Sequence, residues 1–365
     1  MKKRILCACA AGLLLAAGCT SQSGEAEVEL QPDFTVEAAA QPEYPILTIY
    51  SPLTEPEVSV YFDAFERDTG IRVEWEHLST PDMLDRVWQE RDAPQASVMF
   101  GGSSENYIAI AGQGLLEPYE PEGLEQIADI YQDAAHMWSP CYVGAICFAY
   151  NEETFAREKL PLPQTWNDLL DPVFRGRIVM AHPSLSGTSY TIIAGLAQMR
   201  GEDAAFAYLK KLDENIAYYT KGGPFSPSAV GLGDAALCIT FAHDALRQAH
   251  EGLPIKIVFP SDGTSYEIGA MALIRNADPR EAQNARTFLD WVLSPRGQEC
   301  YIDAKGERLP VNPSAKTAEG LTELDRVSTI RYDTQWCAEN REHLIERFVQ
   351  EIRAAEDTGD GEVLE

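Results

Sequence analysis

Three loops rich in serine, threonine and glycine each stand between a short apolar run and a helical pattern. Their candidate ligand-contacting residues are Ser51 and Thr54 in the first loop, Gly102 and Ser103 in the second, and Ser186, Gly187 and Thr188 in the third. The first N–H groups of a helix lack intrahelical partners and the helix dipole makes this end positive, so each loop suits an anion. One such loop alone would be an ordinary helix cap. Three in one chain predict a shared anion site.

One further polar loop and one polar residue within an apolar segment lie outside these three loops. His243 and Asp244 are adjacent and follow the apolar run 237–241, and Glu267 lies in a later apolar segment. A carboxylate accepts hydrogen bonds, and a neutral imidazole can donate or accept one. The alternatives are structural: Asp244 would cap the helix expected at 245–250, and Glu267 would be a hinge residue bound to a backbone amide.

Thr220 and Lys221 form a further candidate, because they end an apolar run just before Gly222 and Gly223. The threonine would offer a hydroxyl to an anion and the lysine a positive charge. Lysine is mostly exposed in proteins, so Lys221 is equally well explained as an ordinary surface residue.

Apolar runs of strand length alternate with helical patterns along the chain. Strands are expected at residues 47–50, 71–75, 96–100, 177–181 and 237–241. This alternation predicts α/β lobes built on mostly parallel sheets. In such sheets ligands bind beyond the carboxyl ends of the strands, where the polar loops lie.

The first expected helix illustrates how these loops begin. Its apolar face at positions i, i+3, i+4 and i+7 is formed by Val58, Tyr61, Phe62 and Phe65. Thr54 and Glu57 have the spacing of a capping box, and Gly70 is expected to end the helix.

Composition limits the classes of function. The chain has 365 residues and a formal net charge of −28, which argues against nucleic acid as a partner because phosphate backbones require basic surfaces. The length exceeds what one core usually serves, so two lobes are expected. No cofactor motif is present, and we expect a monomer.

The amino-terminal residues 1–18 have the layout of a secretory signal peptide, with a basic start and an apolar run too short to span a bilayer, which needs roughly 20 residues. The sequence LAAGC ending at Cys19 resembles a bacterial lipobox, which predicts acyl chains on Cys19 that hold the protein to a membrane surface. The alternative is an ordinary secretory signal with an incidental cysteine. Residues 19–43 are expected to form a disordered tether and residues 356–365 a fraying acidic tail.

Five of the eight cysteines lie beyond Cys19: Cys141, Cys147, Cys238, Cys300 and Cys337. Cys141 and Cys147 fall on one expected strand, too far apart to pair with each other. An extracytoplasmic location permits disulfides, and Cys300 with Cys337 is the candidate pair. No C-x-x-C or Cys/His spacing indicates zinc.

Residues 176–301 carry a family resemblance. The segments GRIVMAHPSLSGTSYT, YTKGG, FAHDAL, VFPSDGTSYEIGAMALI and EAQNARTFLDWVLSPRGQECY follow one another as they do in extracellular solute-binding proteins of ABC importers. The sequence most resembles the branch grouped with ferric-ion-binding proteins but credited with hexose phosphates or 2-aminoethylphosphonate. On the amino side, YSPLTEPEVSVYFDAFERDTGIRVEW extends the resemblance.

The resemblance implies a type II periplasmic-binding-protein fold, with two α/β lobes, a cleft between them and an ABC permease as partner. Lobe one would comprise residues 44–139 with 264–306, and lobe two residues 140–263 with 307–355. Hinge strands would lie near 141–150 and 265–272, and the lobes would close around the solute.

The resemblance also assigns roles. In the hexose-phosphate members a His-Asp pair and a later Glu contact the sugar, which implies His243, Asp244 and Glu267 here. Ser186, Gly187 and Thr188 match the phosphate loop. Ser51, Thr54, Gly102, Ser103, Thr220 and Lys221 are the remaining implied contacts.

Three alternatives stay open. A 2-aminoethylphosphonate receptor would use the same loops, with Asp244 and Glu267 facing the ammonium group. A ferric receptor would use tyrosinates, but adjacent Tyr218 and Tyr219 point to opposite faces of a strand, which predicts that they divide between core and cleft. An enzyme built on Ser186, His243 and Asp244 lacks the G-x-S-x-G elbow, and adjacent His and Asp do not stack easily as base and orienting residue.

Overall fold

The computed structural model describes residues 44–305, 308–317, 321–322 and 324–354. The expected signal peptide, the lipid anchor at Cys19, the tether and the acidic tail lie outside the described residues. Within the described ranges no helix is long and apolar enough to cross a membrane.

The described strands form one ten-stranded sheet. They are β1 Ile46–Ser51, β2 Arg72–His77, β3 Val98–Ser103, β4 Leu116–Glu117, β5 Ser139–Asn151, β6 Ile178–Ala181, β7 Ile216–Thr220, β8 Leu237–Phe241, β9 Ile255–Val258 and β10 Tyr266–Ile274.

The described α-helices are α1 Glu55–Thr69, α2 Thr80–Gln89, α3 Ser104–Gly112, α4 Glu152–Glu158, α5 Gly187–Arg200, α6 Glu202–Asp213, α7 Phe225–Leu232, α8 Ala242–His250, α9 Ala282–Leu293, α10 Pro295–Asp303 and α11 Thr334–Glu351. Short 3-10 helices lie at η1 Leu124–Gln126, η2 Asp129–Tyr131, η3 Trp166–Leu170, η4 Pro172–Phe174 and η5 Leu324–Arg326.

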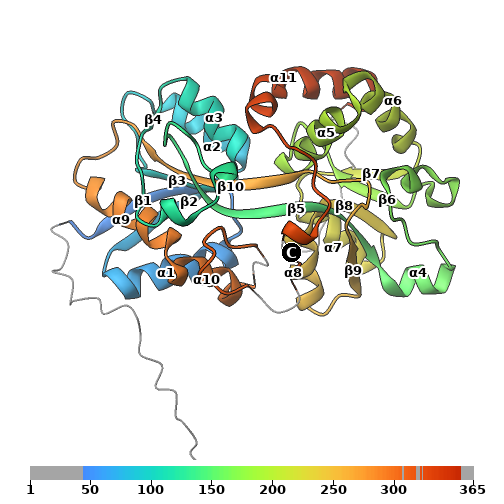
Figure 1. The fold of residues 1–365 in the computed structure, drawn as a ribbon, viewed down its shortest axis with the longest axis horizontal. Coiled ribbons are helices and arrows are strands. Elements are labelled where there is room, and N and C mark those ends of the chain that lie inside the picture. The colour runs from blue at the N-terminus through green and yellow to red at the C-terminus, as the bar shows by residue number, and fades with distance from the viewer. Residues whose placement is uncertain (1–43, 306–307, 318–320, 323, 355–365) are drawn as a thin grey trace, which may run out of the picture. The chain divides into compact units, whose positions relative to one another are not determined.

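The sheet runs in the order β2-β1-β3-β10-β5-β8-β6-β7, with β4 beside β10 and β9 beside β5. β1 is parallel to β2 and β3, and β6 is parallel to β7 and β8. Two antiparallel strands, β10 and β5, lie side by side between these parallel groups (Figure 1). The predicted α/β class with a mixed sheet is confirmed, but the sheet is not mostly parallel, because β5 and β10 pair antiparallel with each of their neighbours. The expected hinge segments form these two central strands.

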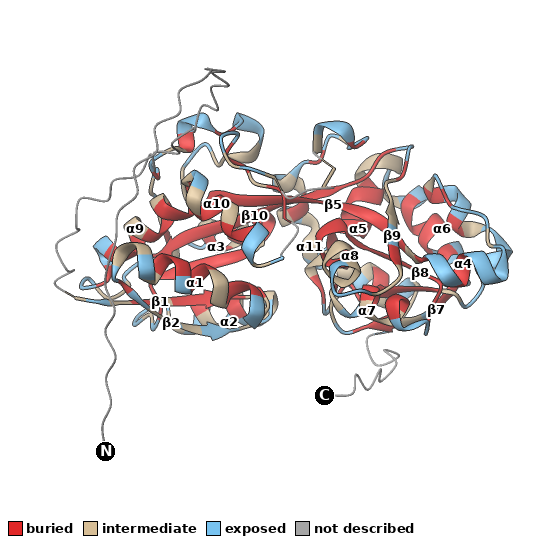
Figure 2. Ribbon diagram, turned by 90° about the horizontal axis from the view of Figure 1, so that it is seen from below, coloured by how far each residue is buried: buried red, intermediate tan, exposed pale blue. Residues whose placement is uncertain are grey.

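Helices cover both parallel groups (Figure 2). Strands β3, β6 and β8 are buried along almost their whole length, whereas the edge strand β2 is largely exposed. Contacts between residues far apart in sequence complete the first group. The Glu281 carboxylate accepts from the backbone N–H of Thr48 at 2.8 Å and from Ser97 Oγ at 2.7 Å. Asn284 donates to the carbonyls of Tyr44 and Ile46. Residues at the start of α9 therefore bind the backbone of β1 and complete the packing around it.

Helix α1 forms where the sequence predicts it, but its start is built differently. Thr54 is the N-cap residue, and Gly70 ends the helix with a left-handed φ of 73°. Neither half of the predicted capping box forms: the Thr54 side chain makes no cap bond, and the Glu57 carboxylate binds Arg308. This prediction is wrong because a buried arginine satisfies Glu57 more strongly than a backbone amide would.

All five described cysteines are buried and free, so the predicted Cys300–Cys337 disulfide is wrong. The two residues lie on helices packed against different neighbours. Cys300 is on α10, which packs on α1 and α9, whereas Cys337 is on α11, which packs on α3 and α5.

Candidate functional site

Glu267 lies at the centre of the polar residues that the structure gathers. It is on β10, opposite Gly144 of β5, and only 4% of it is exposed. Its Oε2 accepts a hydrogen bond from Ser103 Oγ at 2.8 Å. Its Oε1 lies 3.5 Å from Arg308 Nη1 and 3.7 Å from His243 Nε2. Glu267 lies on an expected hinge strand, but among the described residues its carboxylate is bound by side chains and not by a backbone amide. Desolvation raises its pKa to about 7.

His243 is held in the first turn of α8. This helix begins at Ala242 with Phe241 as N-cap residue, and the His243 ring stacks on the Phe241 ring at a centroid distance of 5.0 Å. Nε2 of the ring lies 3.0 Å from Arg308 Nη1, whereas Nδ1 is buried without a hydrogen-bond partner. Desolvation, with the charges of Arg308 and Arg247, lowers the pKa of His243 well below its ordinary value.

Arg308 is the main residue that the sequence analysis missed. Its guanidinium binds both carboxylate oxygens of Glu57 on α1 and lies over the Tyr142 ring, 4.2 Å from its centroid. It is buried, and it links Glu57, His243 and Glu267 although 251 residues separate it from Glu57. Sequence signals for it are weak, because one arginine outside a periodic element resembles any surface residue.

Asp244 is also in the first turn of α8 and is not the N-cap residue that the structural alternative required. It is buried, and its Oδ1 lies 3.7 Å from Arg247 Nη2. Desolvation raises its pKa, and the charge of Arg247 opposes that effect. Arg247 also donates from Nη1 to Thr54 Oγ1 at 3.2 Å, which brings Thr54 to the same cluster.

The serine hydroxyls of the first and second loops differ in whether they reach the polar cluster around Glu267. Ser51 Oγ donates to the Phe100 carbonyl of β3 at 2.8 Å and accepts from the Leu53 N–H at 3.2 Å, so its hydroxyl already has partners within the protein. Gly102 has a φ of 82°, and its N–H donates to Tyr142 at 3.2 Å. Ser103 caps α3 by position, but its hydroxyl turns to Glu267.

The third loop meets the second. Ser186 is the N-cap residue of α5, and its side chain makes no cap bond. A Cβ on Gly187 would lie 4.0 Å from Ser103 Oγ, so the starts of α3 and α5 face each other. A Cβ on Gly223 would collide with Thr188 Oγ1, which places the segment after β7 beside the same helix start.

Thr220 and Lys221 differ in what they can offer. The Thr220 hydroxyl bonds to the Gly222 carbonyl at 3.0 Å and to Ser226 Oγ at 2.9 Å. Lys221 is exposed. This loop therefore stabilises its own turn, and its contribution to an anion site would come from its position beside α5.

Buried polar atoms without a hydrogen-bond partner collect at these helix starts. Among the described residues they include Oγ of Ser104, both carboxylate oxygens of Glu105, Oδ1 of Asn106 and Oγ of Ser189. Ser104 and Ser189 end two of the predicted polar loops, whereas Glu105 and Asn106 carry no signal in the sequence. Unsatisfied buried groups are costly, so a group that forms hydrogen bonds with these atoms would be favoured here.

The tyrosines proposed for iron lie elsewhere. Tyr219 is buried and donates to Asp213 Oδ1 at 2.9 Å, and Tyr218 packs against the smaller apolar cluster that contains Cys147 and Cys238. They take opposite faces of β7 as predicted, but neither hydroxyl joins His243. Within the described ranges, no group of three or more His, Cys, Asp or Glu side chains is placed to hold a metal ion.

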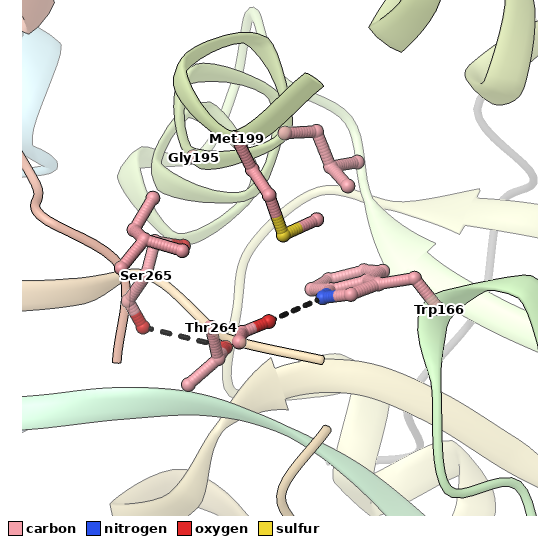
Figure 3. A pocket seen from close by; sticks show the side chains of 8 residues that line it. Trp166, Gly195, Met199, Thr264 and Ser265 are labelled. Carbon is pink, nitrogen blue, oxygen red and sulfur yellow. Dashed lines mark hydrogen bonds between the residues drawn. The ribbon is translucent and has the colours of Figure 1, made fainter. Parts of the chain in front are cut away.

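A small pocket under α5 contains none of the predicted site residues. It is lined by Trp166, Gly195, Leu196, Met199, Gly263, Thr264, Ser265 and Ile330 (Figure 3). Its polar groups are already used: Trp166 Nε1 donates to the Gly263 carbonyl at 2.8 Å, and Ser265 Oγ donates to the Thr191 carbonyl at 3.0 Å. The pocket is a packing gap beside β10, separate from the polar cluster at Glu267 and His243.

The chain is similar to several known proteins. The family model described as bacterial extracellular solute-binding protein matches residues 105–334. An uncharacterised protein of Haemophilus influenzae is 31% identical over 85% of this chain and 91% of its own length. The periplasmic binding protein AfuA of Actinobacillus pleuropneumoniae, solved with exogenous fructose-6-phosphate bound, is 32% identical, with a TM-score of 0.79 over 84% of this chain and 98% of its own.

Other relatives carry different solute names. The Fe(3+)-binding periplasmic protein of Serratia marcescens is 24% identical over 69% of this chain and 75% of its own length. A putative 2-aminoethylphosphonate-binding periplasmic protein of Salmonella typhi is 25% identical over 66% and 69%.

Proposed function

Because the chain belongs to the bacterial extracellular solute-binding proteins, the receptors of ABC importers, we propose that it captures a small phosphorylated solute such as a hexose 6-phosphate. The solute would lie between two lobes, and the closed receptor would deliver it to the permease. The family is one of transport proteins and not of enzymes.

The observation that carries this proposal is the convergence of three helix starts on one polar cluster. The starts of α3 and α5 meet at Ser103 and Gly187, and α8 brings His243 to Glu267. Helix starts favour a phosphate, and the adjacent carboxylates accept from hydroxyls. A site with helix starts beside carboxylates suits a solute that carries a phosphate at one end and hydroxyls at the other.

Closure around the solute is supported by contacts between the expected lobes. Arg247 on α8 donates to Thr54 before α1, and Arg308 joins Glu57 on α1 to His243 on α8. Between these contacts, β5 and β10 are continuous paired strands that could act as the hinge.

The second candidate is a 2-aminoethylphosphonate receptor. It is favoured by the Salmonella relative's name and by the two buried carboxylates, Asp244 and Glu267, which would accept from an ammonium group. The helix starts of α3 and α5 would hold the phosphonate in the same way.

Thermal unfolding of the chain from Gln41 onward tests both candidates. The panel is glucose 6-phosphate, fructose 6-phosphate, 2-aminoethylphosphonate, inorganic phosphate and ferric citrate. A solute at a hundred times its dissociation constant adds about 2.7 kcal/mol to the free energy of unfolding. We expect a hexose phosphate to raise the midpoint most. A rise with ferric citrate alone would overturn the phosphate site.

We also propose that acyl chains on Cys19 anchor the receptor to the cell surface, which the lipobox-like sequence supports. Cys19→Ser should release the protein from the membrane fraction into the soluble fraction. Retention of the variant in the membrane fraction would refute the anchor.

A further inference from the structure

The contact between Arg308 and His243 decides which ring nitrogen carries the proton. Nη1 of Arg308 lies 3.0 Å from Nε2 of His243. A guanidinium has only donors and keeps its charge in proteins, so Nε2 must accept this bond through its lone pair. An imidazole that accepts at Nε2 is neutral and carries its single proton on Nδ1.

No neighbouring carboxylate competes for Nε2. Glu267 Oε1 lies 3.7 Å away and Asp244 Oδ1 lies 4.0 Å away, both beyond hydrogen-bond distance. Glu57 holds Arg308 in place through two bonds to the guanidinium, and the Tyr142 ring supports its flat face. These contacts hold the Arg308 side chain in place independently of the imidazole.

The ring itself is also fixed, so Nδ1 has a defined direction. It stacks on Phe241 with an interplanar angle of 18°. A Cβ on Gly144 would lie only 2.6 Å from Nδ1, so only a glycine fits beside this edge of the ring. Nδ1 is buried and has no partner among the described residues. A buried donor without an acceptor costs about 1–3 kcal/mol, so a solute atom that accepts from it would be favoured.

We propose that Arg308 is a positioning residue that fixes His243 as its Nδ1-protonated tautomer, so that the site demands a hydrogen-bond acceptor on the solute. The demand discriminates between the two candidate solutes. A hydroxyl can accept from Nδ1–H and donate to Asp244 or Glu267, whereas an ammonium group only donates. The proposal rests on the proposed function and deepens it: the site selects a hydroxyl-bearing phosphate ester over an aminoalkylphosphonate.

The charges around the ring agree with a neutral imidazole. The groups that face it are Arg308, Arg247 and Asp244, with Glu267 from β10 and Glu57 behind Arg308. Desolvation and the two arginines lower the pKa of His243 well below its ordinary value. Solute binding should therefore show no titration of this ring near pH 6.5.

The tautomer can be read without any solute. Protonated and unprotonated imidazole nitrogens have well-separated ¹⁵N chemical shifts, and His243→Gln assigns the signals of this ring. In the solute-free chain from Gln41 onward we expect a neutral ring protonated on Nδ1 from pH 5 to pH 8. A ring protonated on Nε2, or one that becomes cationic near pH 6.5, overturns the proposal.

Variants of Arg308 test its role directly. Arg308→Met leaves Glu57 buried and unpaired, so the double variant Glu57→Gln/Arg308→Met is used beside it. We expect the pKa of His243 to rise in the double variant, because the charge of Arg308 no longer opposes protonation while desolvation and Arg247 still lower the pKa. Arg308→Lys keeps a donor and should keep the Nδ1 tautomer. Arg286→Met, at an exposed arginine paired with Glu117, is the control.

Solute affinity supplies the second measurement. For a hexose phosphate, the double variant should bind about tenfold more weakly at pH 7.5, which is the loss of about 1.4 kcal/mol, and binding should weaken further as the ring becomes protonated at lower pH. Arg308→Lys should restore most of the affinity. Equal affinity and an unchanged pH profile in the double variant would remove Arg308 from this role.

The two proposals fail separately. An Nδ1-protonated ring in a protein that binds no sugar phosphate refutes the proposed solute and leaves the role of Arg308 intact. Hexose-phosphate binding with an Nε2-protonated ring refutes the role of Arg308 alone. Tighter binding of 2-aminoethylphosphonate than of any hexose phosphate, with the ring protonated on Nδ1, refutes the discrimination.

Discussion

The hydroxyl of Ser103 donates to Oε2 of Glu267 at 2.8 Å, although 164 residues separate them. This bond joins the end of β3, where α3 begins, to the central strand β10. It places the hydroxyl of a helix cap next to a buried carboxylate. The helix starts proposed to bind the phosphate therefore adjoin the carboxylate proposed to accept from the hydroxyls of the solute.

The burial of Glu267 predicts how stability changes with pH. Desolvation raises its pKa from 4.5 to about 7, so the folded protein holds this proton more tightly than the unfolded chain. The resulting stabilisation is complete below pH 4.5 and is lost as the pH rises through about 7. It amounts to about 3 kcal/mol, at 1.36 kcal/mol per pKa unit.

Glu267→Gln should remove that dependence. Urea unfolding between pH 4.5 and pH 8 would show a shallower decline for the variant than for the unaltered chain. Glu74→Gln, at an exposed residue paired with Arg72, is the matched control and should leave the profile unchanged. Parallel profiles for Glu267→Gln and the unaltered chain would contradict the prediction.

Asp244→Asn should separate binding from folding. The side chain caps no helix, and its nearest described charge is Arg247 at 3.7 Å, so the isosteric amide should cost the fold little. Differential scanning fluorimetry should give a midpoint close to that of the unaltered chain but no rise with a hexose phosphate. Asp203→Asn, at an exposed residue, should keep the full rise.

Asp244→Ala provides a stricter version of the same measurement, because it removes every acceptor at this position. If the solute-induced rise survives in Asp244→Ala, this residue does not contact the solute.

Gly101 should not tolerate a side chain. Its φ is 93°, and a Cβ there would lie 2.7 Å from Leu53 Cγ. Gly101→Ala should lower the free energy of unfolding by about 1–3 kcal/mol through backbone strain and contact with Leu53. Gly112→Ala, in α3 with nothing within 4 Å of the added Cβ, should be neutral or stabilise by about 0.5–1 kcal/mol. Chemical unfolding of both variants measures these changes. Equal changes in the free energy of unfolding would contradict the prediction.

The thiols of the folded protein should be unreactive. Cys141, Cys147, Cys238, Cys300 and Cys337 are all buried and free, and desolvation raises the pKa of each thiol. Thiol titration of the chain from Gln41 onward should give almost no reaction in the native state and five equivalents after unfolding without reductant. Three equivalents after unfolding would reveal a disulfide.

The elements of this fold could be predicted because they depend on neighbouring residues. The face made by Val58, Tyr61 and Phe65 is buried in α1, and the strand at 237–241 is present as β8. Periodicity and apolar runs contain this information directly. The errors arise where a distant residue changes a local choice: Glu57 has the spacing of a capping box, but Arg308 takes its carboxylate.

The candidate site was predicted in part for a different reason. His243, Asp244 and Glu267 were chosen from a family resemblance, and the structure brings all three together. Ser51 was predicted to contact the solute because of its polar loop, but its hydroxyl donates to the Phe100 carbonyl. Arg308 and Glu105 carry no local pattern, because their importance comes from burial that only the packed chain creates.

The order of the strands has a consequence for biosynthesis. β3 needs β10 as its second neighbour, and the Glu281 carboxylate that binds Thr48 lies 233 residues later. At about 5–20 residues per second, a ribosome takes roughly 10–50 s to add that length. Until β10 has also been made, one edge of β3 is an open template for pairing with other chains. The amino-terminal half therefore cannot complete its fold before the chain has been made as far as Glu281.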